Sequence, residues 1–293
     1  MSTQTWQRVR PAPSMMCLQD ADAHTLRHAA AAVVLLRNLK TRPQVAFQYD
    51  NPKDEARCLA CGMPAPKAFY SDAFREGETL SLEVVQSRLC SMMAMAAARM
   101  GVQVYDARKR KDPRGDDNMG FLATLTEYYG CSGMKDFQFH FDTMVDDDPR
   151  RPPDCKNYLQ VTIVYYLIDP SKEEEALRRP GQGSTLYNLE DVPACTPETE
   201  VAYAPLRNGR ITLLDGSRFH AVGPNFGLER GAVLYKCFLY TSDTERQQSR
   251  EAWWHRLQST LLDMAADPAW QLQVAPPRIM KLSDALRPPR ARN

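Results

Sequence analysis

The chain has 293 residues, of which 43% are hydrophobic, so it is long enough to bury a substantial core in one large or two modest domains. Its 37 Lys and Arg residues nearly balance its 36 Asp and Glu residues, and the formal net charge is +1. This balance excludes a strong overall field that would draw the protein to nucleic acid or to a membrane.

Two helices are expected in the first third of the chain. Residues 1–15 are polar and contain prolines, and we expect them to be loosely ordered. Residues 20–39 predict a helix with an Ala-rich apolar face and with Asp20 or Asp22 as its cap. Residues 79–100 predict another helix, whose dense Met and Ala stretch indicates core packing and not a cofactor site.

The second half of the chain contains one segment that is too long for a simple hairpin. Residues 169–210 carry a charged run and several prolines, which favour an exposed loop over a buried strand pair. This loop is either a substrate lid or an ordinary surface insertion. Residues 244–265 predict a last helix, and a tail punctuated by prolines follows it.

Three residues have the types and the order of the ligands of a non-haem iron: His140, Asp142 and His220. Two imidazoles and one carboxylate on one face of Fe(II) leave the other positions open for an oxo-acid and for dioxygen. His140 and Asp142 are two residues apart, so on an extended strand their side chains point to the same side. We expect His220 to come from a β-hairpin over residues 210–222, because Asp215-Gly216 separates two apolar segments there.

A basic residue for an oxo-acid lies ten residues beyond His220. Arg230 opens the apolar run at 231–235, and its planar guanidinium matches a carboxylate with two donors. Lys236 is a weaker candidate for the same task. Even spacing puts it on the same strand face as Arg230, but only one basic residue is needed. We therefore predict that Arg230 binds the far carboxylate of 2-oxoglutarate.

The remaining histidines and the cysteines are interpreted as structural. His24 and His28 lie four apart on one helix face without a third ligand, and His255 lies on the last helix, at the surface or an interface. The eight cysteines indicate reduced thiols, because no export signal is visible. Cys58 and Cys61 have the spacing of a metal knuckle, but no second pair completes a structural zinc site.

Further segments have the order of a known enzyme core. These are 121–130, which ends in Tyr and Gly; 158–167; 181–187, a loose match to Gly-Gly-x-Leu; and 220–225, which is similar to His-x-Val-x-Pro. With the three ligands, residues from about 118 to 242 resemble the double-stranded β-helix of the Fe(II)- and 2-oxoglutarate-dependent dioxygenases, in their prolyl-hydroxylase-like form.

The resemblance implies an α+β fold, in which a jelly-roll, cupin-like core is buttressed by N-terminal helices and by a C-terminal helix. It divides the chain into a helical support (1–117), the core with its insertion (118–242) and a C-terminal helix and tail (243–293), within one compact unit. It also implies strands at 121–130 and 158–167, and it makes Tyr129 a further candidate for contact with 2-oxoglutarate.

The reaction implied by the resemblance is hydroxylation of a C–H bond with Fe(II), 2-oxoglutarate and O2, with succinate and CO2 as products and ascorbate as a candidate reductant. Asp142 favours hydroxylation, because related halogenases lack this carboxylate. The first expectation for the substrate is a protein or peptide side chain, and a small molecule is the alternative. A nucleic-acid base is less favoured, because no basic groove is visible.

A member of a different class would be a non-catalytic, cupin-like binding module. The complete set of metal ligands disfavours it. The longest apolar run, at 29–36, is too short to span a bilayer, and the N-terminus lacks a secretory pattern, so we expect an intracellular, cytoplasmic protein that does not bind membranes. The sequence does not indicate an oligomeric state.

Overall fold

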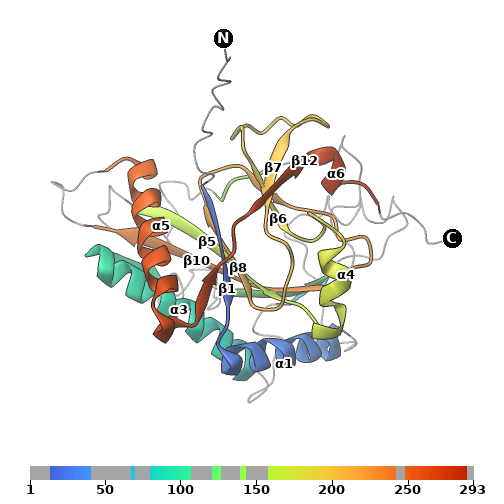
Figure 1. Ribbon diagram of the computed structural model, residues 1–293, viewed down its shortest axis with the longest axis horizontal. Coiled ribbons are helices and arrows are strands. Elements are labelled where there is room, and N and C mark those ends of the chain that lie inside the picture. The colour runs from blue at the N-terminus through green and yellow to red at the C-terminus, as the bar shows by residue number, and fades with distance from the viewer. Residues whose placement is uncertain are drawn as a thin grey trace, which may run out of the picture.

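The computed structural model describes residues 14–40, 67–69, 80–106, 121–126, 139–142, 158–241 and 248–288. Within these residues the chain forms two antiparallel β-sheets, and helices cover one outer face (Figure 1). The expectation of an α+β protein is therefore confirmed. None of the helices in this part of the chain is long and apolar enough to cross a bilayer.

The helices are α1 (Ala23–Lys40), α3 (Leu80–Met100), α4 (Glu173–Leu177), α5 (Arg250–Ala266) and α6 (Leu282–Ala285), with 3-10 turns η3 (Pro170–Lys172) and η5 (Pro268–Trp270). The strands are β1 (Met15–Asp20), β2 (Lys67–Phe69), β3 (Gln103–Asp106), β4 (Phe121–Thr126), β5 (Tyr158–Leu167), β6 (Thr185–Asn188), β7 (Glu200–Tyr203), β8 (Arg210–Asp215), β9 (His220–Val222), β10 (Arg230–Tyr240), β11 (Leu272–Val274) and β12 (Arg278–Lys281).

The larger sheet has the strand order β11-β1-β8-β5-β10-β4-β2, and β3 pairs with the far end of β10. Its centre is the long pair β5 and β10, which runs in register from Leu167 opposite Gly231 to Tyr158 opposite Tyr240. The smaller sheet has the order β12-β7-β6-β9. The two sheets therefore share no strand, and the chain crosses repeatedly from one to the other.

Alternation along the strands gives each sheet two apolar faces. On β5, Tyr165 points to the outer side of the large sheet and joins the core formed with α1, α3 and α5. Its neighbour Tyr166 points inward and packs with Tyr187 and Ala202 of the small sheet. On the outer side of the small sheet, Leu186 packs with Leu282 of α6. The inner faces of the two sheets thus enclose a second core, as period-two alternation requires.

The long predicted helices are confirmed with small shifts at their ends. Helix α1 begins after Asp22, whose carboxylate accepts hydrogen bonds from the backbone N–H groups of His24 (3.2 Å) and Thr25 (3.1 Å), so Asp22 is the cap. Helix α3 begins one residue later than predicted, and its Met and Ala stretch is buried in the core. Helix α5 begins at Arg250, after the cap Ser249, and not at residue 244.

The predicted hairpin over residues 210–222 is wrong. Strand β8 pairs with β1 and β5 in the large sheet, whereas β9 pairs with β6 in the small sheet. Gly216 lacks the positive φ that a type I′ hairpin turn needs, and the Asp215 carboxylate instead accepts the N–H of Ser217 (3.0 Å). This Asx turn sends the chain across the gap between the two sheets.

The interpretation of residues 169–210 as an exposed loop is also wrong. The segment contains β6 and β7, which pair with each other, and residues 181–188 are buried throughout. Its polar Thr185 is satisfied inside the protein, because its hydroxyl accepts a hydrogen bond from Tyr166 (2.8 Å). The segment after α5, which was predicted to be a tail, forms two further strands. Strand β11 extends the large sheet and β12 extends the small sheet. Strand β1 at the N-terminus was not predicted either.

Candidate metal centre

His140 and His220 are brought side by side by the backbone at the edge of the small sheet. The N–H of His140 donates to the carbonyl oxygen of His220 (2.9 Å), and the N–H of His220 donates to that of His140 (2.8 Å). The ring centroids lie 4.6 Å apart. A single antiparallel bridge therefore joins two residues that are 80 positions apart in the sequence, which is what a shared metal ion requires.

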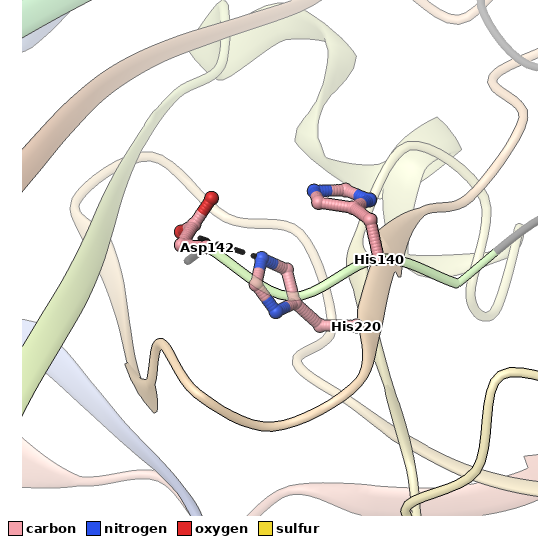
Figure 2. Close-up of side chains that lie close together, drawn as sticks. All are labelled: His140, Asp142 and His220. Atoms are coloured by element: carbon pink, nitrogen blue, oxygen red, sulfur yellow. Dashed lines mark ion pairs between the residues drawn. The ribbon is translucent and has the colours of Figure 1, made fainter. Parts of the chain in front are cut away.

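Asp142 completes the group from the same extended segment. Its N–H donates to the carbonyl oxygen of Gly216 (2.7 Å), and its Oδ2 lies 3.6 Å from Nε2 of His220. Figure 2 shows the three side chains close together, with a dashed line between the Asp142 carboxylate and the His220 ring. One ligand atom of each residue lies within 4.8 Å of the others. The three predicted ligands therefore form one cluster.

The His220 ring is oriented from its far side. Its Nδ1 lies 2.9 Å from the carbonyl oxygen of Arg218, so this nitrogen carries a proton that it donates to the carbonyl, and Nε2 faces Asp142. The Arg218 side chain is itself anchored, because it donates to carboxylates of Asp191 and of Glu251 on α5 (2.7 Å to the latter). A ring held from its far side in this way presents Nε2 as the atom that could bind a metal.

Both oxygens of Asp142 have partners on the large sheet. The Thr162 hydroxyl donates to Oδ2 (2.6 Å), and the Lys236 ammonium donates to Oδ1 (2.7 Å). Burial would raise the pKa of Asp142, but Lys236, His220 and these hydrogen bonds outweigh it and hold the pKa below its ordinary value. The carboxylate is therefore ionised at neutral pH, as a metal ligand must be.

The pKa of His140 is lowered to about 4. Partial desolvation of the ring is the main cause, and His220 and Lys236 add to it, while Asp142 acts in the opposite direction. His140 is therefore neutral at physiological pH and has a lone pair for a metal ion.

Arg230 lies at the start of β10, on the same inner face as Lys236 but six residues away along the strand. It is 5% exposed, and its guanidinium carbon lies 5.2 Å from the centre of the Tyr166 ring. Its Nε is buried without a hydrogen-bond partner, and no described residue forms an ion pair with it. The neighbouring Glu229 instead pairs with Arg37 of α1. Arg230 is thus a buried cation whose anion is not supplied by the described part of the chain.

The structure therefore unites His140, Asp142 and His220, adds Lys236 to this group, and places Arg230 at the start of β10, six residues before Lys236. Tyr129, Cys58 and Cys61 lie outside the described residues. Thr162 and Arg218 belong to the site and were not predicted. The sequence alone does not indicate Thr162. The pairing of β5 with β10 places it opposite Lys236, and from there its hydroxyl reaches Asp142. Arg218 acts through a backbone carbonyl, which carries no signal in the sequence.

No family of known sequences matches the chain, and no curated protein matches it. Among solved structures, AviO1 from Streptomyces viridochromogenes Tue57 is similar over 78% of this chain and 91% of its own, with 14% identity and a TM-score of 0.41. A likeness at this level determines neither fold nor function.

Proposed function

We propose that the protein is an Fe(II)- and 2-oxoglutarate-dependent oxygenase that hydroxylates a C–H bond. The observation that carries this proposal is the cluster of His140, Asp142 and His220, which puts two imidazoles and a carboxylate within 4.8 Å of one another. Among the residues that the structure describes, no other group of His, Cys, Asp and Glu side chains meets this condition. This set of donors is the one used by non-haem iron oxygenases.

The arrangement of the sheets supports the proposed double-stranded β-helix. Two antiparallel sheets face each other across an apolar core, and the strands β7, β8, β9 and β10 alternate between the small and the large sheet. The His140 segment and β9 lie next to each other in the small sheet, while β10 with Arg230 lies in the large one. In a jelly-roll core, this order would bring the metal ligands and the cosubstrate anchor to the same internal space.

The residues fit the metal by their chemistry. An ion bound at roughly 2.0–2.2 Å from each donor needs its donors about 3 to 4 Å apart, so small movements of the three side chains suffice here. His140, Asp142 and His220 would hold Fe(II). When bound, iron and 2-oxoglutarate supply the oxidising chemistry, in which the oxo-acid and O2 give succinate, CO2 and a hydroxylated product.

The residues also fit the cosubstrate. The guanidinium of Arg230 suits the far carboxylate of 2-oxoglutarate, because no described residue supplies an anion for it and a bidentate carboxylate would remove the cost of a buried, uncompensated charge. The Tyr166 ring would hold the guanidinium in place, since its own hydroxyl is fixed by Thr185. Lys236 is assigned to Asp142 and not to this carboxylate, because its ammonium already donates to Asp142.

The outcome proposed is hydroxylation, because the Asp142 carboxylate takes the position that a halide would need. A protein or peptide side chain is the first substrate class to test, on the resemblance to prolyl hydroxylases, and small molecules are the second. A screen of peptide, metabolite and oligonucleotide pools for succinate release would separate these classes.

The deciding experiment is an anaerobic titration of the purified protein with Fe(II) and then with 2-oxoglutarate. We expect a weak visible charge-transfer band that appears only when both are present. Asp142→Ala should lack the band because it does not hold iron, whereas Arg230→Met should need far more 2-oxoglutarate to produce it. A protein that binds iron tightly but shows no band at saturating 2-oxoglutarate would instead be a cupin-like binding module.

A further inference from the structure

The two oxygens of Asp142 are held by two different residues on neighbouring strands of the large sheet. Lys236 on β10 and Thr162 on β5 are direct register partners, so their side chains stand next to each other on the inner face. Each one donates to a different oxygen: Lys236 to Oδ1 at 2.7 Å and Thr162 to Oδ2 at 2.6 Å. The backbone of Asp142 meanwhile belongs to the segment that borders the small sheet. The carboxylate is therefore clamped between the two sheets.

The clamp makes the two oxygens unequal as metal ligands. Oδ2 lies 3.6 Å from Nε2 of His220 and gives only one of its lone pairs to Thr162, so the other lone pair is free for the metal. Oδ1 is occupied by a full positive charge, which a second cation cannot displace without cost.

We propose that Lys236 and Thr162 are positioning residues for Asp142: Lys236 restricts the carboxylate to a single coordinating oxygen and so keeps one more position on the metal open, and Thr162 orients the oxygen that coordinates. The inference rests on the divalent-metal site of the proposed function, but it does not depend on 2-oxoglutarate or on any substrate. A carboxylate that binds through both oxygens would fill a position that a chelating oxo-acid or dioxygen needs.

The proposal predicts opposite effects on two quantities in one variant. Removing the Lys236 ammonium takes away a positive charge beside the metal and frees Oδ1 to coordinate. Metal affinity should then rise, while the number of open positions falls. A residue that only supports the fold would weaken metal binding when removed, as most residues that support metal ligands do.

Mn(II) is a suitable probe, because free and bound Mn(II) are distinguished by electron paramagnetic resonance and its coordinated waters by the relaxation rate of water protons. We expect Lys236→Met to bind Mn(II) about tenfold more tightly. We also expect it to lose about one coordinated water from an octahedral ion. Lys236→Arg should restore the wild-type water count, because it restores the charge on Oδ1.

Thr162→Val tests the other half of the clamp. It should weaken Mn(II) binding roughly tenfold, since Oδ2 loses its orienting partner, and it should leave the water count unchanged because Lys236 still holds Oδ1. The matched controls are Lys281→Met, which removes a surface lysine paired with Glu198, and Thr212→Val, which removes a buried threonine hydroxyl on the neighbouring strand β8. Neither control should change Mn(II) affinity or hydration.

Weaker Mn(II) binding by Lys236→Met, or an unchanged water count at full occupancy, would overturn the proposal. Thermal melting of each variant without metal would identify a loss of fold. If Lys236→Met does not fold, Lys236→Arg decides, because a reduced number of coordinated waters in Lys236→Arg would also contradict the clamp. Failure of the proposed function has a different signature, because the wild-type protein itself would then bind no Mn(II), or would bind it without any response to 2-oxoglutarate.

Discussion

Replacement of Arg230 by Met should weaken cosubstrate binding while it strengthens the cosubstrate-free fold. In the wild-type protein the guanidinium is buried, and its Nε has no partner. One unsatisfied buried donor costs about 1–3 kcal/mol. The contact with the Tyr166 ring returns about 0.5–2 kcal/mol. Met keeps the apolar stem, so the free energy of unfolding of the metal-free variant should rise by about 1 kcal/mol and the Tm by roughly 2–4 °C.

The effect of the same change on binding should be far larger. Two charge-assisted hydrogen bonds to a carboxylate contribute about 3 kcal/mol together, and each 1.4 kcal/mol is about a factor of ten. The Kd for 2-oxoglutarate, measured by calorimetry with Mn(II) bound, should therefore rise about a hundredfold. Arg230→Lys should recover part of this loss. Arg207→Met, which removes an exposed arginine beside Glu173, is the control and should change neither quantity.

The two measurements together can refute the reasoning. A variant that is less stable than wild type by about 2 kcal/mol or more, with an unchanged Kd for 2-oxoglutarate, would make Arg230 a structural residue. If Lys236→Met loses most of its affinity for 2-oxoglutarate while Arg230→Met keeps the wild-type Kd, then Lys236 and not Arg230 binds the far carboxylate.

Three further predictions follow from other parts of the structure. Metal-dependent turnover should be abolished in His140→Ala, Asp142→Ala and His220→Ala, each with a near-native circular dichroism spectrum. The control His255→Ala, on the exposed side of α5, should keep its turnover. Activity in one of the three variants, with verified iron content, would remove that residue from the site. The Ser171 hydroxyl and Arg37 lower the pKa of Asp169 to about 2, so its carboxylate stabilises the fold above pH 4 and this contribution is lost as the pH falls towards 2. Urea unfolding should therefore show that Asp169→Asn is less stable than wild type at pH 7. A difference in stability that persists at pH 2 would contradict this linkage. Replacement of residues 185–203 by a short linker should abolish both coupled turnover and the slow uncoupled conversion of 2-oxoglutarate, because β6 and β7 support β9 and His220. If only coupled turnover were lost, residues 169–210 would again be interpreted as a substrate lid.

Local patterns in the sequence were sufficient for the long helices and for the choice of the three candidate metal ligands that the structure brings together. The period of buried residues in α1 and α3 is a property of each segment alone, and strand β5 has the predicted bounds. His140 and Asp142 are two residues apart on one extended segment, so their common direction follows from strand geometry. The prediction that Arg230 begins a strand is confirmed for the same reason.

Pairing between distant strands could not be read in the same way. The Asp215-Gly216 turn is compatible with a hairpin and with an Asx turn that crosses between sheets, and the choice depends on β1, more than 190 residues earlier, which pairs with β8. Residues 169–210 carry prolines and charges in their turns, and these masked two short buried strands. Short strands gain their stability from neighbours and not from their own composition.

The sequence by itself determined which residue types could bind iron and which faces of the long elements are apolar, because both depend on chemistry and spacing within short segments. Only the tertiary structure decided that one backbone bridge joins His140 to His220, that Lys236 holds Asp142, that Nε of Arg230 is buried without a hydrogen-bond partner, and that Thr162 contacts Asp142. These contacts depend on the register of strands that meet only when the two sheets have formed, and no local pattern encodes that register.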